Sequence, residues 1–190
     1  MRVVGGDLKG RRLAAPPGDR TRPTSDRVRE SIFNALWSRG ALDDETTVLD
    51  LFAGSGALGI EALSRGAAHA TFVDDNAAAR RTVAENLAAT GLTDRATVVA
   101  DRAERFLAAT ATTTTTTLGP SRYDLAFCDP PYAFDGWAEL LDRLPAELVV
   151  IEAACEIGLP AGWELVRSAQ YGTTWVGFAE LTWSPPEDET

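Results

Sequence analysis

The chain has 190 residues, of which 45% are hydrophobic and 24% are charged. The length suggests one α/β domain with an appendage, and the composition is that of a soluble globular protein with enough apolar residues for a core. No apolar run is long enough to cross a bilayer, and the first residues lack the apolar centre of a signal peptide, so we expect a cytoplasmic protein without membrane contact. With two cysteines and one histidine, and no metal-type spacing between the cysteines, the sequence predicts no metal site and a reducing compartment.

The formal net charge of −10 argues against a nucleic-acid partner, but its distribution argues the other way. Residues 1–40 carry nine basic and four acidic residues, whereas the remaining 150 residues carry nine basic and 24 acidic ones. A basic segment on an acidic body is a candidate contact for a polyanion. Charges scattered over a solvated surface explain the same counts equally well, so the charge distribution alone does not decide whether the protein binds nucleic acid.

The first 40 residues are expected to form a small extension. Residues 2–15 predict two short strands around a glycine turn, and the prolines of residues 15–24 predict an irregular connector. Thr24 or Ser25 can cap a helix that runs to about Ser38. Helical spacing places five apolar residues on one face of it: Val28, Ile32, Phe33, Leu36 and Trp37.

Buried strands then alternate with amphipathic helices. We expect strands at residues 46–52, 69–75, 95–100, 123–129 and 147–154, with helices at 57–66, 76–91, 103–110 and 137–144. This βαβ order predicts a largely parallel sheet with right-handed crossovers, in which the first and fourth strands are neighbours. Residues 163–183 predict a hairpin around Tyr171–Thr174 that ends the sheet.

The sequence thus divides into an extension (1–40), an α/β domain (41–184) and an acidic tail (185–190). The threonine run Thr112–Thr117 is interpreted as a surface insertion. His69, at a strand start, is expected to be structural. Four tryptophans are assigned to core or strand packing rather than to base stacking: Trp37, Trp163, Trp175 and Trp183. Trp137 stays open, because it follows the acidic tetrapeptide described below by only a few residues.

A glycine loop follows the first strand of the alternating region. Gly54, Gly56 and Gly59 form G-x-G-x-x-G between that strand and a helix, which lets a ligand approach the backbone closely. The motif serves both dinucleotides and S-adenosylmethionine. Asp74 ends the next strand, where a ribose-binding carboxylate belongs, and is preferred to Asp75 for that role. Asp50 favours S-adenosylmethionine, because a carboxylate there attracts a cation and repels a pyrophosphate; a structural carboxylate is the alternative.

The deciding pattern is Asp129-Pro130-Pro131-Tyr132, at the end of the fourth strand. The Asp129 carboxylate and the Pro130 carbonyl can accept the two hydrogens of an exocyclic amine on a nucleobase and so orient its nitrogen. The prolines stiffen the turn. Tyr132 offers a face on which an extruded base can stack, worth roughly 1–3 kcal/mol. A merely rigid turn is the alternative for this tetrapeptide.

These residues resemble the bacterial 16S rRNA guanine-N2 methyltransferases that act on guanine 966, over nearly the whole chain. The resemblance rests on five stretches: Arg2–Gly6, Thr21–Asn34, Val48–Gly59, Glu61–Gly66 and Asp129–Tyr132. It implies a seven-stranded Rossmann-like methyltransferase sheet with a C-terminal antiparallel hairpin, S-adenosylmethionine as cofactor and 16S rRNA, within a small-subunit particle, as partner. A monomer is our default.

The resemblance also implies site residues. Arg22 and Thr24, with Pro23 between them, would help to close the cofactor pocket, and basic residues of the extension would face the RNA: Lys9, Arg11, Arg12 and Arg27. From the residues alone, Arg22, Arg27 and Arg29 are equally well phosphate contacts or helix-surface charges. The family often places Asp or Asn directly before the alanine after the third strand, to bind adenine. Here Arg102 precedes Ala103, so either Asp101 or the backbone takes that role.

Three alternatives stay open at this point. The first is a methyltransferase acting on DNA or on another amino group with the same tetrapeptide. The second is a dinucleotide-dependent oxidoreductase, which would leave Asp50 and Asp129–Tyr132 without a role. The third is a non-catalytic RNA-binding module, for which Asp129 would be dispensable.

Overall fold

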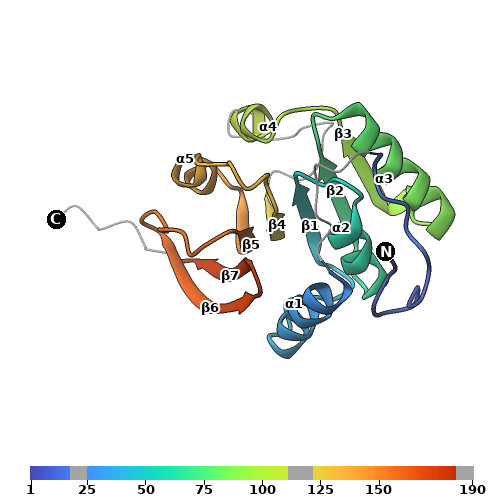
Figure 1. Ribbon diagram of the computed structural model, residues 1–190, viewed down its shortest axis with the longest axis horizontal. Helices are drawn as coiled ribbons and strands as arrows, with labels where there is room; N and C mark the ends of the chain where they lie inside the picture. The colour runs from blue at the N-terminus through green and yellow to red at the C-terminus, as the bar shows by residue number, and fades with distance from the viewer. Residues whose placement is uncertain (18–24, 111–121, 183–190) are drawn as a thin grey trace.

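The computed structural model describes residues 1–17, 25–110 and 122–182. Seven strands form one sheet in the order β3-β2-β1-β4-β5-β7-β6 (Figure 1). The strands are β1 (Thr47–Leu51), β2 (His69–Val73), β3 (Ala96–Val99), β4 (Tyr123–Cys128), β5 (Ala146–Ala153), β6 (Trp163–Tyr171) and β7 (Thr174–Leu181). The first five pair in parallel, and β7 pairs antiparallel with both β5 and β6. The predicted fold class is confirmed, including the neighbouring first and fourth strands.

Helices cover both faces of the sheet. They are α1 (Asp26–Ser38), α2 (Ala57–Ser64), α3 (Ala77–Thr90), α4 (Ala103–Thr110) and α5 (Trp137–Asp142), with a short 3-10 turn at Thr93–Arg95. Because side chains alternate along a strand, Val48 faces one helical layer and Leu49 the other. The core on the first face includes α1, α2 and α3, and the core on the second includes α4 and α5. None of the helices in the described ranges is long and apolar enough to traverse a bilayer.

Helix α1 begins where the sequence predicts. Ser25 is its N-cap, and the Ser25 hydroxyl accepts a hydrogen bond from the Val28 N–H (3.3 Å). Val28, Ile32, Phe33 and Leu36 are buried as expected. The placement of Trp37 in that face was wrong: it is 67% exposed. Leu36 and Ala35 already fill the inner face at that turn, which leaves Trp37 on the solvent side.

The predicted N-terminal pair of strands reduces to one antiparallel bridge between Arg2 and Arg12. The pairing within the segment is limited to a few backbone bonds, such as Val3 N–H to the Arg11 carbonyl (2.9 Å) and Leu13 N–H to the Met1 carbonyl (3.1 Å), while other groups bond to helix α2. Val4 N–H donates to the buried Glu61 carboxylate of α2 (2.7 Å), and Leu8 N–H donates to the Ser64 hydroxyl (3.0 Å). Val3 and Leu13 enter the same core as α1, α2 and α3, so residues 1–17 pack as part of the domain.

Close approach explains the paired glycines of this segment. A Cβ on Gly6 would stand 1.9 Å from the Ser64 carbonyl oxygen, and Gly6 has a φ of +72°. Further along, the Asn86 side chain of α3 accepts from Ala14 N–H (2.8 Å) and donates to the Ala14 carbonyl (3.1 Å). The N-terminal segment is thereby tied across both α2 and α3 and led to Pro16 and Pro17.

Candidate active site

The glycine loop leaves β1 through a run of left-handed backbone. Phe52 has a φ of +62°, Gly54 of +55° and Gly56 of +75°. Such a φ is strained for phenylalanine but free for glycine. Gly56 is the N-cap of α2, and the Asn86 amide donates to the Ser55 carbonyl (2.9 Å). The loop is therefore held by the same side chain that ties down the N-terminal segment.

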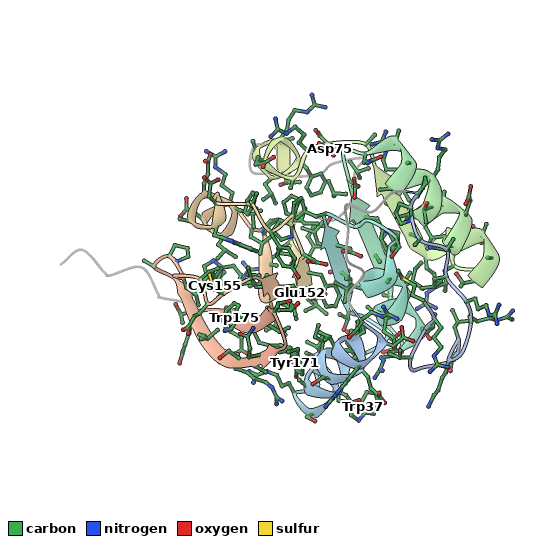
Figure 2. The ribbon with its side chains drawn as sticks, in the orientation of Figure 1. Trp37, Asp75, Glu152, Cys155, Tyr171 and Trp175 are labelled. Carbon is green, nitrogen blue, oxygen red and sulfur yellow. The ribbon has the colours of Figure 1, made fainter. Side chains whose placement is uncertain are left out.

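Asp74 directly follows β2 and reaches the glycine loop. One of its carboxylate oxygens accepts from Gly54 N–H (2.8 Å), and the other accepts from Asn76 N–H (2.8 Å). Asp75, labelled in Figure 2, is exposed and also borders the cavity. Each Asp74 oxygen keeps a second lone-pair position for a ligand hydroxyl.

Asp50 lies beneath the loop rather than on the cavity surface. Its carboxylate is only 2% exposed and accepts from Gly59 N–H (3.0 Å). Burial raises the pKa of this carboxyl well above its usual value, the Gly59 bond opposes that shift, and the nearby Asp129 and Asp74 carboxylates add to it. Asp50 therefore does not border the cavity, and its bond to Gly59 positions the start of α2.

Asp101 follows β3 and precedes α4. The same carboxylate oxygen accepts from Arg102 N–H (2.7 Å) and from Arg105 Nε (2.5 Å). The side chain is 14% exposed and borders the cavity together with Arg102 and Ala103. Both open assignments for adenine recognition, Asp101 and the backbone beside Arg102, thus lie at the same cavity wall.

The acidic corner, Asp129–Tyr132, directly follows β4. Strand β4 pairs with β1 so that Cys128 stands opposite Leu51. The residues that follow these two strands, Phe52 and Asp129, therefore leave the sheet side by side. Phe134 N–H donates to the Pro131 carbonyl (2.8 Å), which closes the proline turn. Pro130 is buried, whereas Tyr132 is 58% exposed, and its hydroxyl lies 3.4 Å from Thr174 Oγ1 on the β6–β7 turn.

One cavity of about 1130 Å³ joins these pieces. Of the expected site residues, those that line it are Gly54, Asp74, Asp101, Asp129, Pro130 and Tyr132. Asp50, Gly56 and Gly59 lie behind the wall, while Arg22 and Thr24 lie outside the described residues, as do Thr112–Thr117, Trp183 and the acidic tail. The volume exceeds that of an ordinary small-ligand pocket, so it has room for two ligand groups side by side.

The cavity wall is acidic. Within the described part of the chain, Arg102 is the only basic residue on it, against six acidic ones: Asp74, Asp75, Asp101, Glu104, Asp129 and Glu152. Such a wall favours a cation and hydroxyl groups, and it disfavours a phosphate or pyrophosphate.

Three features of the wall were not expected from the sequence. Phe52, with its positive φ, makes an edge contact with Phe134 (5.5 Å between ring centres), and Phe134 makes another with Trp137 (5.2 Å). Trp137 supports this wall without lining it. Pro16 and Pro17 reach the cavity from the extension, and Glu152 reaches it from β5. The sequence contained a signal for two of these features: Phe52 stands two residues before Gly54, and Glu152 is an acid within an apolar strand.

The basic residues of the extension divide into two kinds. Lys9, Arg11, Arg12 and Arg27 are exposed. Arg29 is buried, and its guanidinium donates to the Arg2 carbonyl (2.5 Å) and to the Asp26 carboxylate (2.7 Å). Both alternatives for Arg29 were therefore wrong: it is neither a surface charge nor available to a phosphate, but joins α1 to the N-terminal segment at Arg2.

Three residues predicted to be structural, His69, Trp163 and Trp175, lie outside the cavity. His69 lies at the start of β2, outside the cavity, and its Nε2 is 2.9 Å from Thr97 Oγ1. Trp163 and Trp175 are buried in the core as predicted. Cys128 is a free buried thiol, and Cys155 is free and exposed.

Comparison with known proteins decides the family. The family model described as conserved hypothetical protein 95 matches residues 1–180. The chain belongs to this family. A relative from Bacillus subtilis, YlbH, is 42% identical over 186 residues, covering 93% of this chain and 96% of that protein. Ribosomal RNA small subunit methyltransferase D of Escherichia coli K12 is 37% identical over 182 residues, covering 90% of this chain and 85% of that protein.

Solved structures agree with this assignment to the conserved hypothetical protein 95 family. The Escherichia coli protein yhhF is 35% identical, with a TM-score of 0.78 over 95% of this chain and 97% of that one. A more distant structure, SMU.776 complexed with SAH, is 15% identical and shares the fold, with a TM-score of 0.65 over 85% of this chain and 50% of that one. The family expected from the sequence resemblance is thereby confirmed.

Proposed function

We propose that this protein moves a methyl group from S-adenosylmethionine to the N2 amine of a guanine in 16S rRNA, guanine 966 by resemblance. One observation supports the proposal more than any other. Gly54 of the glycine loop, Asp74 after β2 and the corner Asp129–Tyr132 line a single acidic cavity. A cofactor held by the first group and a base held by the second would meet there.

The donor set suits S-adenosylmethionine. Asp74 has free lone pairs for ribose hydroxyls, Asp101 or the neighbouring backbone is placed for the adenine, and Gly54 permits close approach of the backbone. The buried Asp50 and the acidic wall favour the positive charge of the cofactor, which supplies, when bound, a methyl group already activated on sulfur. Arg22 and Thr24 remain proposed as residues that close this pocket.

The corner Asp129–Tyr132 orients the amine nitrogen, which is the nucleophile. The Asp129 carboxylate and the Pro130 carbonyl accept the hydrogens of the amine, which keeps the nitrogen oriented and its lone pair aimed along one direction. Positioning of this kind accounts for much of the rate of a bimolecular transfer. Tyr132, more than half exposed at the rim, stacks on the extruded base.

The extension supplies the RNA contact. Lys9, Arg11, Arg12 and Arg27 are exposed on residues 1–40, and the same segment carries Pro16 and Pro17 to the cavity wall. Phosphate contacts would therefore hold the substrate near the acidic cavity despite the net charge of −10. We extend the proposal to a cytoplasmic monomer that acts on a small-subunit particle, with residues 1–40 as the RNA contact and cofactor lid.

The experiment that tests the proposal maps methylated nucleotides in 16S rRNA from cells with and without the gene. We expect one N2-methylguanine to disappear on deletion and to return with the wild-type gene. An unchanged methylation map would overturn the proposed function. Calorimetry with S-adenosylmethionine and with NAD tests the cofactor separately, and preferential binding of NAD would reject it.

A further inference from the structure

Glu152 is an ionisable residue in the cavity wall that the proposed chemistry leaves without a role. It lies near the end of β5, is 4% exposed, and borders the cavity between its apolar strand neighbours Ile151 and Ala153. Acidic side chains are seldom buried to this degree, because removing a carboxylate from water is costly.

The register of the sheet places Glu152 beside Asp129. Strands β4 and β5 are parallel neighbours in which Cys128 stands opposite Ile151. The next residues along each strand are Asp129 and Glu152, and both border the cavity. Neighbouring strands are separated by about 4.8 Å, so the sheet presents two carboxylates at one level, on adjacent strands, to the same space. Figure 2 shows Glu152 near the middle of the molecule.

The hydrogen-bonding groups of the bases suggest a function for this pair of carboxylates. In guanine the exocyclic amine sits next to a ring N–H, at N1, so its Watson–Crick edge presents adjacent donors. In adenine and in cytosine the ring nitrogen next to the amine is an acceptor. An ionised carboxylate accepts hydrogen bonds and donates none. A second carboxylate beside the one that accepts the amine therefore suits guanine and opposes the other two bases.

We propose that Glu152 accepts the N1–H of the target guanine while Asp129 and Pro130 accept the hydrogens of its amine. Glu152 is then the residue that selects guanine among bases with an exocyclic amine. This inference rests on the proposed function and adds the residue that sets its base specificity. A site built to bond a substrate N–H rejects an analogue without it strongly, because the acceptor aimed at that hydrogen then faces a lone pair of the analogue.

The test compares ribosomal RNA substrates that carry guanosine or 2-aminopurine riboside at the methylated position. 2-Aminopurine keeps the amine but has an acceptor at N1. We expect the wild-type enzyme to prefer guanosine by at least about 100-fold in kcat/KM. In Glu152→Gln, the amide can donate to N1 of 2-aminopurine, so the preference should shrink at least about tenfold, with binding of S-adenosylmethionine unchanged within about twofold. A purely structural role would not change the preference between the two bases.

The matched control is Glu156→Gln, an exposed glutamate four residues further along, which should leave the ratio unchanged. Equal use of both substrates by the wild type would overturn the inference without any variant, which covers the case in which Glu152→Gln does not fold. An unchanged preference in a folded Glu152→Gln would overturn the role of Glu152 alone. If the wild type methylates no guanosine substrate, the proposed function itself fails, and this inference with it.

Discussion

The buried carboxylate of Asp50 accepts a hydrogen bond from the backbone N–H of Gly59, at 3.0 Å, and so joins the middle of β1 to the first turns of α2. Gly59 has no room for a side chain: a Cβ there would lie 2.4 Å from the Phe72 ring and 3.2 Å from the Asp50 carboxylate. The glycine motif is thus used at this position for helix-to-strand packing, and the buried Asp50 carboxyl group lies directly beneath it.

Asp50→Asn should stabilise the protein and weaken its cofactor binding. Asparagine keeps an acceptor for Gly59 N–H but removes a buried charge, so we expect the free energy of unfolding at pH 7 to rise by about 1–2 kcal/mol. The affinity for S-adenosylmethionine should fall about tenfold, because the positive charge loses its partner. Thermal unfolding and calorimetry measure the two effects.

The stability difference should depend on pH in one direction. Burial raises the pKa of Asp50 in the folded protein above the unfolded value of about 3.9. The folded state therefore binds more protons between the two values, and wild-type stability falls relative to Asp50→Asn as pH rises through that window. Asp44→Asn, at an exposed position, is the control. A difference that grows as pH falls would contradict this account.

Gly59→Ala should destabilise the fold by about 1–3 kcal/mol, the usual cost of overpacking a core. The Phe72 ring and the backbone of α2 would have to shift to admit the methyl group. Gly158→Ala is the matched control, since nothing lies within 4 Å of its Cβ position. Thermal denaturation of the two variants side by side decides the point, and equal melting temperatures would refute the packing role.

Asn86→Ala should loosen the N-terminal segment. The Asn86 side chain is buried and bonds Ala14 N–H, the Ala14 carbonyl and the Ser55 carbonyl. Its loss leaves these groups unpaired, at a cost of about 2–3 kcal/mol. Limited trypsin digestion should then cut faster at Lys9, Arg11 and Arg12. Asn34 is exposed, so Asn34→Ala should be digested at the wild-type rate. A wild-type digestion rate for Asn86→Ala would contradict the role of Asn86 in holding the N-terminal segment.

Asp129→Ala should lower the rate of methyl transfer at least about 100-fold, in the range found when one preorganised polar group is removed from a site. The amine then loses the acceptor that orients it, while the ribose and adenine contacts proposed for the cofactor remain. Single-turnover transfer of labelled methyl groups to small-subunit particles measures the loss. Asp135→Ala, exposed and outside the cavity wall, should retain full activity. Full methyl transfer by Asp129→Ala would contradict the orienting role proposed for this carboxylate.

Neutralising the extension should change the salt dependence of RNA binding. For the double variant Lys9→Gln, Arg11→Gln, we expect weaker binding and a slope of log K against log salt that is shallower by about one unit per lost phosphate contact. Arg143 follows α5 on the opposite face of the sheet, so Arg143→Gln should keep the wild-type slope. Identical slopes for all three proteins would place the RNA elsewhere.

The sequence by itself determined the order of elements, the seven-stranded sheet and the residues that end its strands. These follow from local patterns: strands of apolar residues, caps such as Ser25, and the rule that parallel strands alternate with helices. Because ligands bind at the carboxyl ends of such strands, the positions of Gly54, Asp74, Asp101 and Asp129 around one cavity could also be predicted before any coordinates.

Only the tertiary structure decided what each polar side chain touches. Arg29 and Arg27 are two residues apart and look alike in the sequence, yet one is buried against Asp26 and the other is exposed. Trp37 fits a helical apolar face but is 67% exposed, because Ala35 and Leu36 occupy the inner face at that turn. Glu152 stands in an apolar strand with no local signal of its neighbour Asp129, 23 positions earlier. Such contacts depend on register and packing between distant segments, and no local sequence pattern encodes them.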